Sequence, residues 1–257
     1  MRLDQYLVER GLYPSREKAK LAVLAGEVEV LRKGRPLKPG EQVGNCEVEI
    51  NQRRRPPFVS RGGEKLQGAL DAWNMDVQGR QALDIGSSTG GFTDCLLASG
   101  AKRVIALDVG EGLLHWKLRN DPRVHVMEGV NARFLYADML PFLPDLVCID
   151  VSFISLRLIF RQLNGLMAGN GEVIALVKPQ FEAGRQHVGK GGVVKDPGIH
   201  LKVLVELDRD IEGMGFFLHE AVEAFPRGKQ GNREFMTLWK KEKRPQGELD
   251  LEGLCKG

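Results

Sequence analysis

The sequence predicts an α/β protein: a mostly parallel sheet that ends in an antiparallel hairpin, preceded by a small α+β module. Two observations support this prediction. Beyond residue 60, strand-like segments that are apolar throughout alternate with helical segments, which is typical of a parallel sheet covered on both faces. Near the end of the chain, two further strand-like segments follow each other without a helix between them, which is typical of a hairpin at one sheet edge.

Length and composition exclude several broad classes of protein. The chain has 257 residues, of which 42% are hydrophobic and 28% charged, as in ordinary globular proteins. At roughly 100–200 residues per domain, this length suits one large domain or one medium and one small domain. No apolar run approaches the roughly 18 residues of a membrane span, and the N-terminus lacks the apolar core of a secretory signal. We therefore expect a cytoplasmic protein without a membrane partner.

Residues 1–50 are expected to form a helix–helix–hairpin module. An apolar stripe begins the first helix, Ser15 is the expected N-cap of the second, and Gly26 ends it. Residues 27–30 and 47–50 alternate glutamate with an aliphatic residue, as strands do. The first 60 residues hold 12 Lys and Arg against 8 Asp and Glu, whereas the rest of the chain is nearly neutral. A basic module of this kind suits polyanion docking, although on charge alone a solvated surface is the somewhat stronger interpretation.

The segment RLDQYLVERGLYPSREKAKLAVLAGEVEV, with the basic turn and LKPGEQV after it, resembles the S4 RNA-binding domain. The resemblance implies that the second helix and the following turn contact structured RNA. The basic residues that would then face RNA are Arg2, Arg16, Lys18, Lys20, Arg32, Lys33 and Arg35.

Residues 51–59, NQRRRPPFV, are the expected linker, because proline fixes φ and disfavours helix in the residue before it. The sequence leaves open whether this spacer is passive or positions the module over a site.

The main domain is expected over residues 60–245, and residues 246–257 are expected to form a tail. The expected parallel strands of the main domain are 82–85, 104–107, 124–127, 146–149 and 173–177. Its expected helices include 92–99, 113–119 and 156–167, and its expected hairpin comprises 216–224 and 234–239.

The segment LDIGSSTGGFT, residues 83–93, lies between an apolar strand and a helix. Gly86, Gly90 and Gly91 allow a tight turn and a close backbone approach to a ligand at the carboxyl end of the strand. The glycine spacing differs from the dinucleotide motif and from the P-loop, and the segment has no Arg or Lys to meet a phosphate. A compact adenosine ligand without phosphates therefore fits better than a dinucleotide or a triphosphate.

This loop resembles the S-adenosylmethionine loop of methyltransferases. The next strand ends at Asp108, where a carboxylate can accept both ribose hydroxyls, and Asn131 follows the third strand and could meet the adenine. The expected cofactor-binding residues are Asp84, Gly86, Ser87, Ser88, Gly90, Gly91, Phe92, Thr93, Asp108 and Asn131.

Four charged residues stand in distinctive segments far apart in the sequence: Lys65, Asp150, Lys178 and Glu234. Asp150 and Lys178 end consecutive apolar strands, and the carboxyl ends of parallel strands face the ligand crevice. Any one of the four could be a solvated strand end, but their joint occurrence favours a site.

The four residues resemble the Lys-Asp-Lys-Glu tetrad of FtsJ-type RNA ribose 2′-O-methyltransferases. The strings SRGGEKL, DIGSSTGGFT, DVSFISL, LVKPQFE, GKGGVVKDP and GNREF resemble the TlyA family, also called the hemolysin A family, in this order along the chain. In that family an S4 domain precedes an FtsJ-like domain with a Rossmann-like sheet. The resemblance implies methyl transfer from S-adenosylmethionine to the 2′-hydroxyl of a cytidine in ribosomal RNA.

The residue types suit this chemistry. Lys178 is the candidate group that accepts or steers the hydroxyl proton, which requires its pKa to fall from about 10.4. A neighbouring Lys65 and partial burial would lower it. Asp150 would orient Lys178, and Glu234 would hold either Lys65 or the ribose. No metal is expected, since the four cysteines are widely separated and form no metal-type pair.

The glycine-rich stretch 181–196 is expected to be a flap over the RNA, with Arg185 and Lys190 in contact with it. His187 in the same stretch is expected to contact solvent or phosphate.

The family has a longer form that modifies both ribosomal subunits and a shorter form restricted to the large one. Both ends of this chain resemble the shorter form, so large-subunit RNA is the favoured substrate. The sequence leaves three alternative functions: a non-catalytic ribosome-binding or assembly factor, a pore-forming haemolysin, and a dehydrogenase, which the glycine spacing disfavours.

Overall fold

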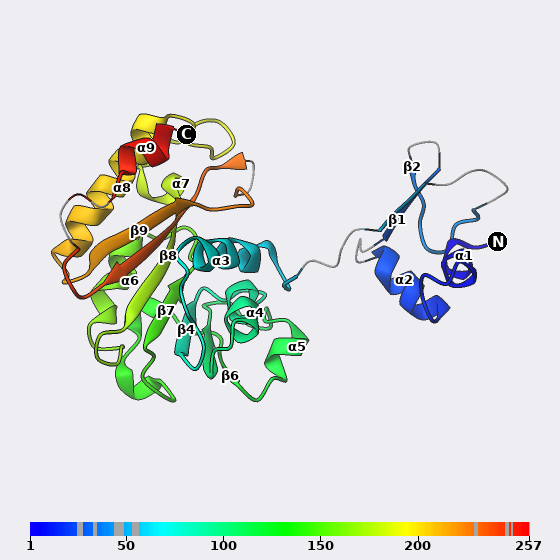
Figure 1. Ribbon diagram of the computed structural model, residues 1–257, viewed down its shortest axis with the longest axis horizontal. Helices are drawn as coiled ribbons and strands as arrows, with labels where there is room; N and C mark the ends of the chain where they lie inside the picture. The colour runs from blue at the N-terminus through cyan, green and yellow to red at the C-terminus, as the bar shows by residue number, and fades with distance from the viewer. Residues whose placement is uncertain are drawn as a thin grey trace. The chain divides into compact units, whose positions relative to one another are not determined.

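In the computed structural model the chain separates into two units, Met1–Pro57 and Phe58–Gly257 (Figure 1). The residues that the structure describes are 1–24, 28–32, 35–43, 49–52, 57–228, 231–244, 247 and 249–256. None of the helices in these ranges is long and apolar enough to cross a membrane.

The first unit packs two short helices against a small antiparallel sheet. The helices are α1 (Leu3–Glu9) and α2 (Arg16–Leu24), and the strands are β1 (Val28–Arg32), β2 (Arg35–Pro36) and β3 (Glu49–Gln52), in the order β2-β1-β3. Its core includes Leu3, Leu7 and Val30, each fully buried. Ser15 caps α2 as expected, because its Oγ accepts a hydrogen bond from the backbone N–H of Lys18 at 3.3 Å. The expected helix end at Gly26 lies outside the described residues.

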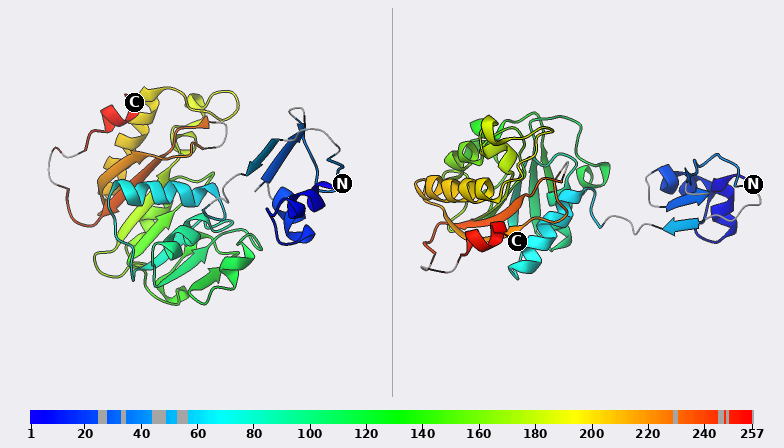
Figure 2. Two further views of the ribbon diagram at one scale, coloured as in Figure 1. Left: turned by 45° about the vertical axis from the view of Figure 1, so that its right-hand side comes forward. Right: turned by 90° about the horizontal axis from the view of Figure 1, so that it is seen from above.

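The second unit is built on a seven-stranded sheet in the order β6-β5-β4-β7-β8-β10-β9 (Figures 1 and 2). Its five parallel strands are β4 (Gln81–Ile85), β5 (Arg103–Leu107), β6 (Val124–Met127), β7 (Leu146–Ile149) and β8 (Glu172–Val177). The last two strands, β9 (Phe217–Glu223) and β10 (Phe235–Lys240), pair antiparallel with each other, and β10 also pairs antiparallel with β8. The predicted parallel sheet with a terminal hairpin is therefore confirmed.

Side chains along the parallel strands alternate between two hydrophobic clusters, one on each face of the sheet. In β4, Leu83 and Ile85 join one cluster and Ala82 joins the other. The first cluster includes residues of α6 (Leu156–Leu163), α8 (Pro197–Glu212) and α9 (Leu251–Lys256). The second includes residues of α3 (Arg61–Ala72) and α4 (Gly91–Ala98). Figure 2 shows these two layers on opposite sides of the sheet.

Two expected helices are shorter than the sequence indicated. The helix expected over 113–119 is only α5 (Trp116–Arg119), because His115 has a non-helical ψ of 137° and caps the helix by accepting from the backbone N–H of Lys117. The helix expected over 156–167 ends at Leu163, where Asn164 turns its side-chain amide to the carbonyl of Met214 at 2.8 Å.

The segment that follows β8 holds more regular structure than a plain loop. It contains α7 (Pro179–Glu182) and the short 3₁₀ helix η3 (Arg185–His187). Two further 3₁₀ helices, η1 (Ala132–Phe134) and η2 (Ala137–Met139), connect β6 to β7. The C-terminal stretch forms α9, which Arg233 fastens by donating to the carbonyls of Leu254 and Cys255.

A cluster of ion pairs ties together the strand ends opposite the carboxyl edge of the sheet. Arg80 Nε lies 2.6 Å from Asp145 Oδ1 ahead of β7, and its Nη1 lies 2.8 Å from Glu172 Oε2 in β8. Glu172 also pairs with Lys240 of β10 at 3.1 Å. Burial opposes ionisation of Glu172, but its hydrogen bonds to Arg80 and Lys240 outweigh burial and lower its pKa. One guanidinium therefore holds three neighbouring strands in register.

Replacing Arg80 by Met should lower the free energy of unfolding of the second unit by about 1–3 kcal/mol, because the partly buried Asp145 loses its guanidinium partner and Glu172 retains only Lys240. All three tryptophans, at positions 73, 116 and 239, lie in this unit, so urea unfolding followed by tryptophan fluorescence reports on it. Lys102→Met, at an exposed cation beside β5, is the matched control and should change stability by less than about 0.5 kcal/mol. Equal unfolding midpoints for the two variants would contradict the expected role of Arg80.

Candidate active site

The loop between β4 and α4 is shaped by close backbone packing. Gly86 has a φ of +85°, and a side chain there would collide with the backbone carbonyl of Asp150. Gly90 has a φ of +95°, and a side chain there would collide with those of Leu114 and Leu118. These two positions therefore require glycine, and the loop lies directly against the end of β7.

Asp84, near the end of β4, is fully buried beneath this loop. Its Oδ2 accepts hydrogen bonds from the backbone N–H of Thr93 at 2.9 Å and from the Thr93 hydroxyl at 2.7 Å. Its Oδ1 is also buried and has no hydrogen-bond partner among the described residues. Burial raises the pKa of Asp84 to about 7, against the opposing effect of the Thr93 hydrogen bonds. The site thus contains a carboxylate that lacks a cationic donor.

Asp108 follows β5 and organises the outer part of the loop. Its Oδ2 accepts a hydrogen bond from the backbone N–H of Ser88 at 2.8 Å, and its Oδ1 accepts one from Gly110 at 2.7 Å. Each carboxylate oxygen has a further lone pair for a ligand hydroxyl. Asn131 lies in the segment after β6, directly before η1, and its side-chain oxygen accepts a hydrogen bond from the backbone N–H of Arg133 at 3.0 Å.

A cavity of about 380 Å³ lies between these two segments. Asp108 and Asn131 line it together with apolar side chains, and no Lys or Arg is among its described lining residues. The apolar lining residues include Leu107, Val109, Leu113, Val130 and Ile154. A cavity with apolar walls, the carboxylates of Asp108 and Asp150 and no cation among its described lining residues suits a nucleoside better than a nucleotide phosphate.

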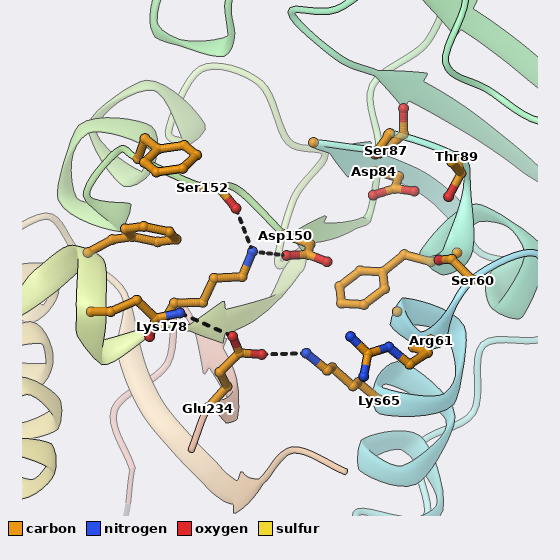
Figure 3. A pocket seen from close by; sticks show the side chains of 18 residues that line it. Ser60, Arg61, Lys65, Asp84, Ser87, Thr89, Asp150, Ser152, Lys178 and Glu234 are labelled. Atoms are coloured by element: carbon orange, nitrogen blue, oxygen red, sulfur yellow. Dashed lines mark hydrogen bonds and ion pairs between the residues drawn. The ribbon is translucent and has the colours of Figure 1, made fainter. Parts of the chain in front are cut away.

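A second cavity of about 340 Å³ adjoins the first, and Gly86, Ser88, Asp150 and Ser152 line both. It contains the four charged residues that the sequence singled out: Lys65, Asp150, Lys178 and Glu234 (Figure 3). A ligand held in the first cavity could therefore extend to these charged groups.

The charged residues form two ion pairs, as Figure 3 shows. Lys178 Nζ lies 2.5 Å from Asp150 Oδ1 and donates a hydrogen bond to Ser152 Oγ at 3.0 Å. Lys65, buried on α3, pairs with Glu234 Oε2. The other Glu234 oxygen accepts a hydrogen bond from Gln180 Nε2 at 3.2 Å. Each lysine thus has its own carboxylate, so Lys65 does not act on Lys178 as an uncompensated charge.

Strand pairing explains how residues so distant in sequence meet. Asp150 and Lys178 directly follow the neighbouring parallel strands β7 and β8. Phe235, the first residue of β10, pairs with Val177, the last residue of β8. Because β10 runs antiparallel to β8, Glu234 enters the sheet beside the point where Lys178 leaves it.

The remaining cofactor candidates fall into two groups. Ser87, Ser88, Gly91 and Phe92 line the second cavity together with Gly86 and Asp84. Thr93 and Gly90 do not line either cavity: Thr93 holds Asp84, and Gly90 packs against α5 and the segment before it.

The basic residues expected to contact RNA are spread over the two units. Arg2 and Arg16 flank the buried Asp4, at 2.8 and 3.7 Å from its oxygens. The hydrogen bond from Arg2 lowers the pKa of Asp4. Arg32 lies 3.7 Å from Glu41. The other exposed cations are Lys18, Lys20, Arg185 and Lys190. Lys33 and the side chain of Arg35 lie outside the described residues.

The expected flap is fastened near its second half. The backbone N–H of Val194 donates to Asn232 Oδ1 at 3.1 Å, and Asn232 Nδ2 donates to the carbonyl of Gly192 at 3.0 Å. The buried His200 contacts the carbonyl of Val194 through Nε2 at 3.0 Å. Arg185 and Lys190 lie outside the lining of both cavities.

Sequence reasoning missed several residues of the second cavity: Ser60, Arg61, Ser152, Phe153, Gln180 and Phe181. All six stand in the same short sequence strings as Lys65, Asp150 or Lys178, and this proximity is the signal that could have identified them. Gln180 could have been found as the polar residue two positions after Lys178. In the described part of the chain, no group of three or more His, Cys, Asp or Glu side chains could hold a metal ion.

The chain matches a known protein family over most of its second unit. The family model described as FtsJ-like methyltransferase matches residues 58–241. The chain belongs to the FtsJ-like methyltransferase family. This confirms the predicted resemblance, the Rossmann-like sheet and the methyltransferase class.

Relatives match over most of the chain. The "Putative rRNA methyltransferase YqxC" of Bacillus subtilis is 46% identical over 91% of this chain and 84% of that protein. The "16S/23S rRNA (cytidine-2'-O)-methyltransferase TlyA" of Mycobacterium tuberculosis is 43% identical over 93% of this chain and 88% of that protein. The solved structure of the "Putative hemolysin from Streptococcus thermophilus" is 39% identical, with a TM-score of 0.77 over 100% of this chain and 94% of that one.

The residues of the two cavities fit S-adenosylmethionine. The unpartnered Asp84 oxygen suits the cationic methionine end, the Gly86 backbone leaves room beside the loop, and Asp108 suits the ribose hydroxyls. The lining of the first cavity, which lacks described cations, suits a nucleoside without phosphates.

Asp84 should give the folded protein a distinctive pH dependence. Its pKa is about 7 in the folded state against an ordinary value of 3.8, so the folded state retains a proton that the unfolded chain has released. Folding stability due to this group is therefore present at low pH and is lost as the pH rises from about 4 to about 7.

Asp84→Asn removes this titration. Between about pH 5.5 and about pH 7.5, the unfolding free energy of the variant should gain about 2 kcal/mol relative to that of the unmodified protein. Urea unfolding by tryptophan fluorescence measures this difference, and Asp138→Asn, at an exposed carboxylate, should show no such change. A difference that stays constant over this pH range would contradict the buried, protonated state of Asp84.

Proposed function

We propose that the second unit transfers the methyl group of S-adenosylmethionine to a ribose 2′-hydroxyl of ribosomal RNA, and that the acceptor is a cytidine. One observation carries this proposal: the ion pairs of Lys65, Asp150, Lys178 and Glu234 meet in a cavity contiguous with a nucleoside-sized cavity. The names of the TlyA relative and of YqxC support the same substrate class. The complete glycine loop favours an enzyme over a non-catalytic binding factor.

The cofactor would span both cavities. Asp108 would accept the ribose hydroxyls, Asn131 would face the adenine, and the apolar residues between them would enclose the ring. The Gly86 loop would pass beneath the sulfur, and Asp84 would accept a hydrogen bond from the ammonium of the methionine end. When bound, S-adenosylmethionine supplies an electrophilic methyl group on a positively charged sulfur.

Lys178 would hold the acceptor hydroxyl. Its ammonium forms an ion pair with Asp150 and donates a hydrogen bond to Ser152, and another of its three N–H groups would donate to the ribose oxygen. When the proton between Nζ and Asp150 resides on the carboxylate, the Lys178 amine can accept the hydroxyl proton as the oxygen attacks the methyl carbon. After the step, Lys178 and Asp150 together would hold one more proton than before, and solvent would remove it. Most of the acceleration would come from in-line alignment, which contributes up to about 7–11 kcal/mol in favourable cases.

Lys65, Glu234 and Gln180 would position the ribose from the other side. The Glu234 carboxylate joins the other two side chains, so it fixes an ammonium and an amide at the cavity wall. These groups can hydrogen-bond ribose oxygens without taking part in proton transfer.

An aromatic pair at the same cavity would hold the target base. Phe153 is 91% exposed with a φ of +64°, a conformation that L-residues rarely adopt. Its ring lies 4.8 Å from that of Phe181, centroid to centroid, and both residues line the cavity. A solvent-exposed phenylalanine beside a polar cavity suits a base turned out of its stack, since RNA-binding proteins stack such bases on aromatic rings.

The first unit would dock the RNA as an S4-like domain over residues 1–50, with 51–59 as linker, 60–245 as methyltransferase domain and 246–257 as tail. Its cations are Arg2, Arg16, Lys18, Lys20 and Arg32, to which the sequence adds Lys33 and Arg35. Arg185 and Lys190 would add contacts from the second unit. We favour the large ribosomal subunit as substrate, and the cytoplasm, where ribosomal subunits are, as the location.

Methyl transfer from labelled S-adenosylmethionine to isolated ribosomal subunits tests the function. Lys178→Met should lower the rate at least about a thousandfold, because the acceptor oxygen loses the group that holds it and takes its proton. Cofactor affinity should stay within about threefold, since Asp84, Asp108 and Asn131, the side chains proposed to bind the cofactor, are unchanged. Lys202→Met, at an exposed cation of α8, is the control and should leave the rate unchanged. Full activity of Lys178→Met would refute its role, and label outside ribose 2′-oxygens would refute the reaction.

Removing residues 1–55 should weaken RNA binding and reduce its salt dependence, because fewer phosphates are neutralised. Affinity for S-adenosylmethionine should persist, since every described lining residue of both cavities belongs to the second unit. Filter binding across a salt series gives both quantities. RNA affinity equal to that of the full chain would show that the first unit is not the docking module.

A further inference from the structure

Glu128, the residue after β6, holds a neighbouring loop by its backbone. Its Oε2 accepts a hydrogen bond from the N–H of Gly112 at 3.0 Å, and its Oε1 accepts from those of Leu113 and Leu114 at 3.1 and 3.2 Å. Arg119 Nη2 on α5 completes the set at 2.6 Å from Oε1. Three successive N–H groups and one guanidinium therefore converge on a carboxylate whose side chain is 12% exposed.

This carboxylate remains charged over the whole physiological range. The Arg119 hydrogen bond, followed by those from the backbone, lowers the pKa of Glu128 to about 2. Another carboxylate of the same loop, the exposed Glu111, lies close to Gly129. A permanent charge thus fixes the outer part of the loop, beside the buried Leu114.

Apolar packing anchors this loop at Leu114, which is 4% exposed, but not at its outer end. Val109 and Leu113 are 71% and 45% exposed, so they contribute little burial. The three N–H groups that point at Glu128 would lose their acceptor together if the carboxylate were removed.

Glu128 joins two walls of the cavity without lining it. Asp108, Val109 and Leu113 form one wall, and Val130 and Asn131 belong to the segment that follows Glu128. Backbone hydrogen bonds tie the same two segments at their base, including Val130 N–H to the Asp108 carbonyl at 3.0 Å. The outer end of the first wall, at Leu113, depends on the Glu128 carboxylate.

We propose that Glu128 is a positioning residue for the adenosine half of the cofactor. It sets the separation of the two walls by holding Leu113 over the cavity, and it acts through the loop rather than by touching the ligand. The inference rests on the proposed function, because it takes the occupant of this cavity to be an adenosine.

Calorimetry on the full chain with two probes tests this role. S-adenosylhomocysteine carries both halves of the cofactor, whereas 5′-methylthioadenosine carries the adenosine half without the amino-acid group. Glu128→Ala should weaken both probes by the same factor, about tenfold. Glu128→Gln should weaken both equally by about threefold, because the amide oxygen can take the place of Oε1 and still accept from Leu113, Leu114 and Arg119, while its NH₂ group leaves the Gly112 N–H without an acceptor. Glu111→Gln, in the same loop, should leave both affinities unchanged.

A purely structural role would not produce this pattern. Asp84→Asn, at the methionine end, should weaken S-adenosylhomocysteine alone, so equal loss of both probes marks the adenosine half. In steady-state methyl transfer, the Glu128 variants should raise the KM for S-adenosylmethionine and leave kcat and the KM for RNA unchanged. If Glu128→Ala fails to fold, as judged by tryptophan fluorescence, Glu128→Gln carries the test.

The outcomes separate the inference from the function on which it rests. Failure of the unmodified protein to bind either probe overturns the proposed function and the inference with it. Normal binding by the unmodified protein with unchanged affinity in the Glu128 variants overturns the inference alone. Loss of S-adenosylhomocysteine binding without loss of 5′-methylthioadenosine binding also overturns it, since the effect would then lie at the other end of the cofactor.

Discussion

The close approach of two strand ends, at Gly86 and Asp150, is the constraint on which the rest of the site depends. The carbonyl of Asp150 occupies the space that any side chain at Gly86 would need, and the N–H of Asp150 donates to the carbonyl of Ile85 at 2.9 Å. Because both residues line both cavities, this contact is where the nucleoside-sized space and the charged space join. A wider separation of β4 and β7 would divide a ligand from the groups that act on it.

Charge balance gives the second cavity its character. Four ionised side chains in a partly buried space would be costly as separate charges, since desolvation disfavours each of them. Their arrangement as two ion pairs, each linked to a neutral polar group, offsets this cost and leaves donors at the cavity wall. Ser152 serves Lys178 in this way, and Gln180 serves Glu234. The same arrangement fixes the orientation of every group before a ligand arrives.

Carboxylates that bind backbone N–H groups recur on the cofactor side. Asp108 holds Ser88 and Gly110, and Glu128 holds the next turn of the same loop. Asp84 differs, because burial leaves one of its oxygens without a donor. Two of these carboxylates shape the cavity, and the third retains binding capacity for a cation. This division follows from how many N–H groups each carboxylate meets.

The sequence by itself determined the local features. Uninterrupted apolar segments fixed the parallel strands, and glycine spacing placed the loop at Gly86, because both depend on neighbours in the chain. Only the tertiary structure decided which groups pair. The sequence left either Lys65 or the ribose as the partner of Glu234, and the antiparallel entry of β10 beside β8 placed Glu234 within reach of Lys65. The tertiary structure also placed Glu128 against the N–H groups of Leu113 and Leu114, which precede α5. Such contacts depend on strand order, which periodicity does not contain.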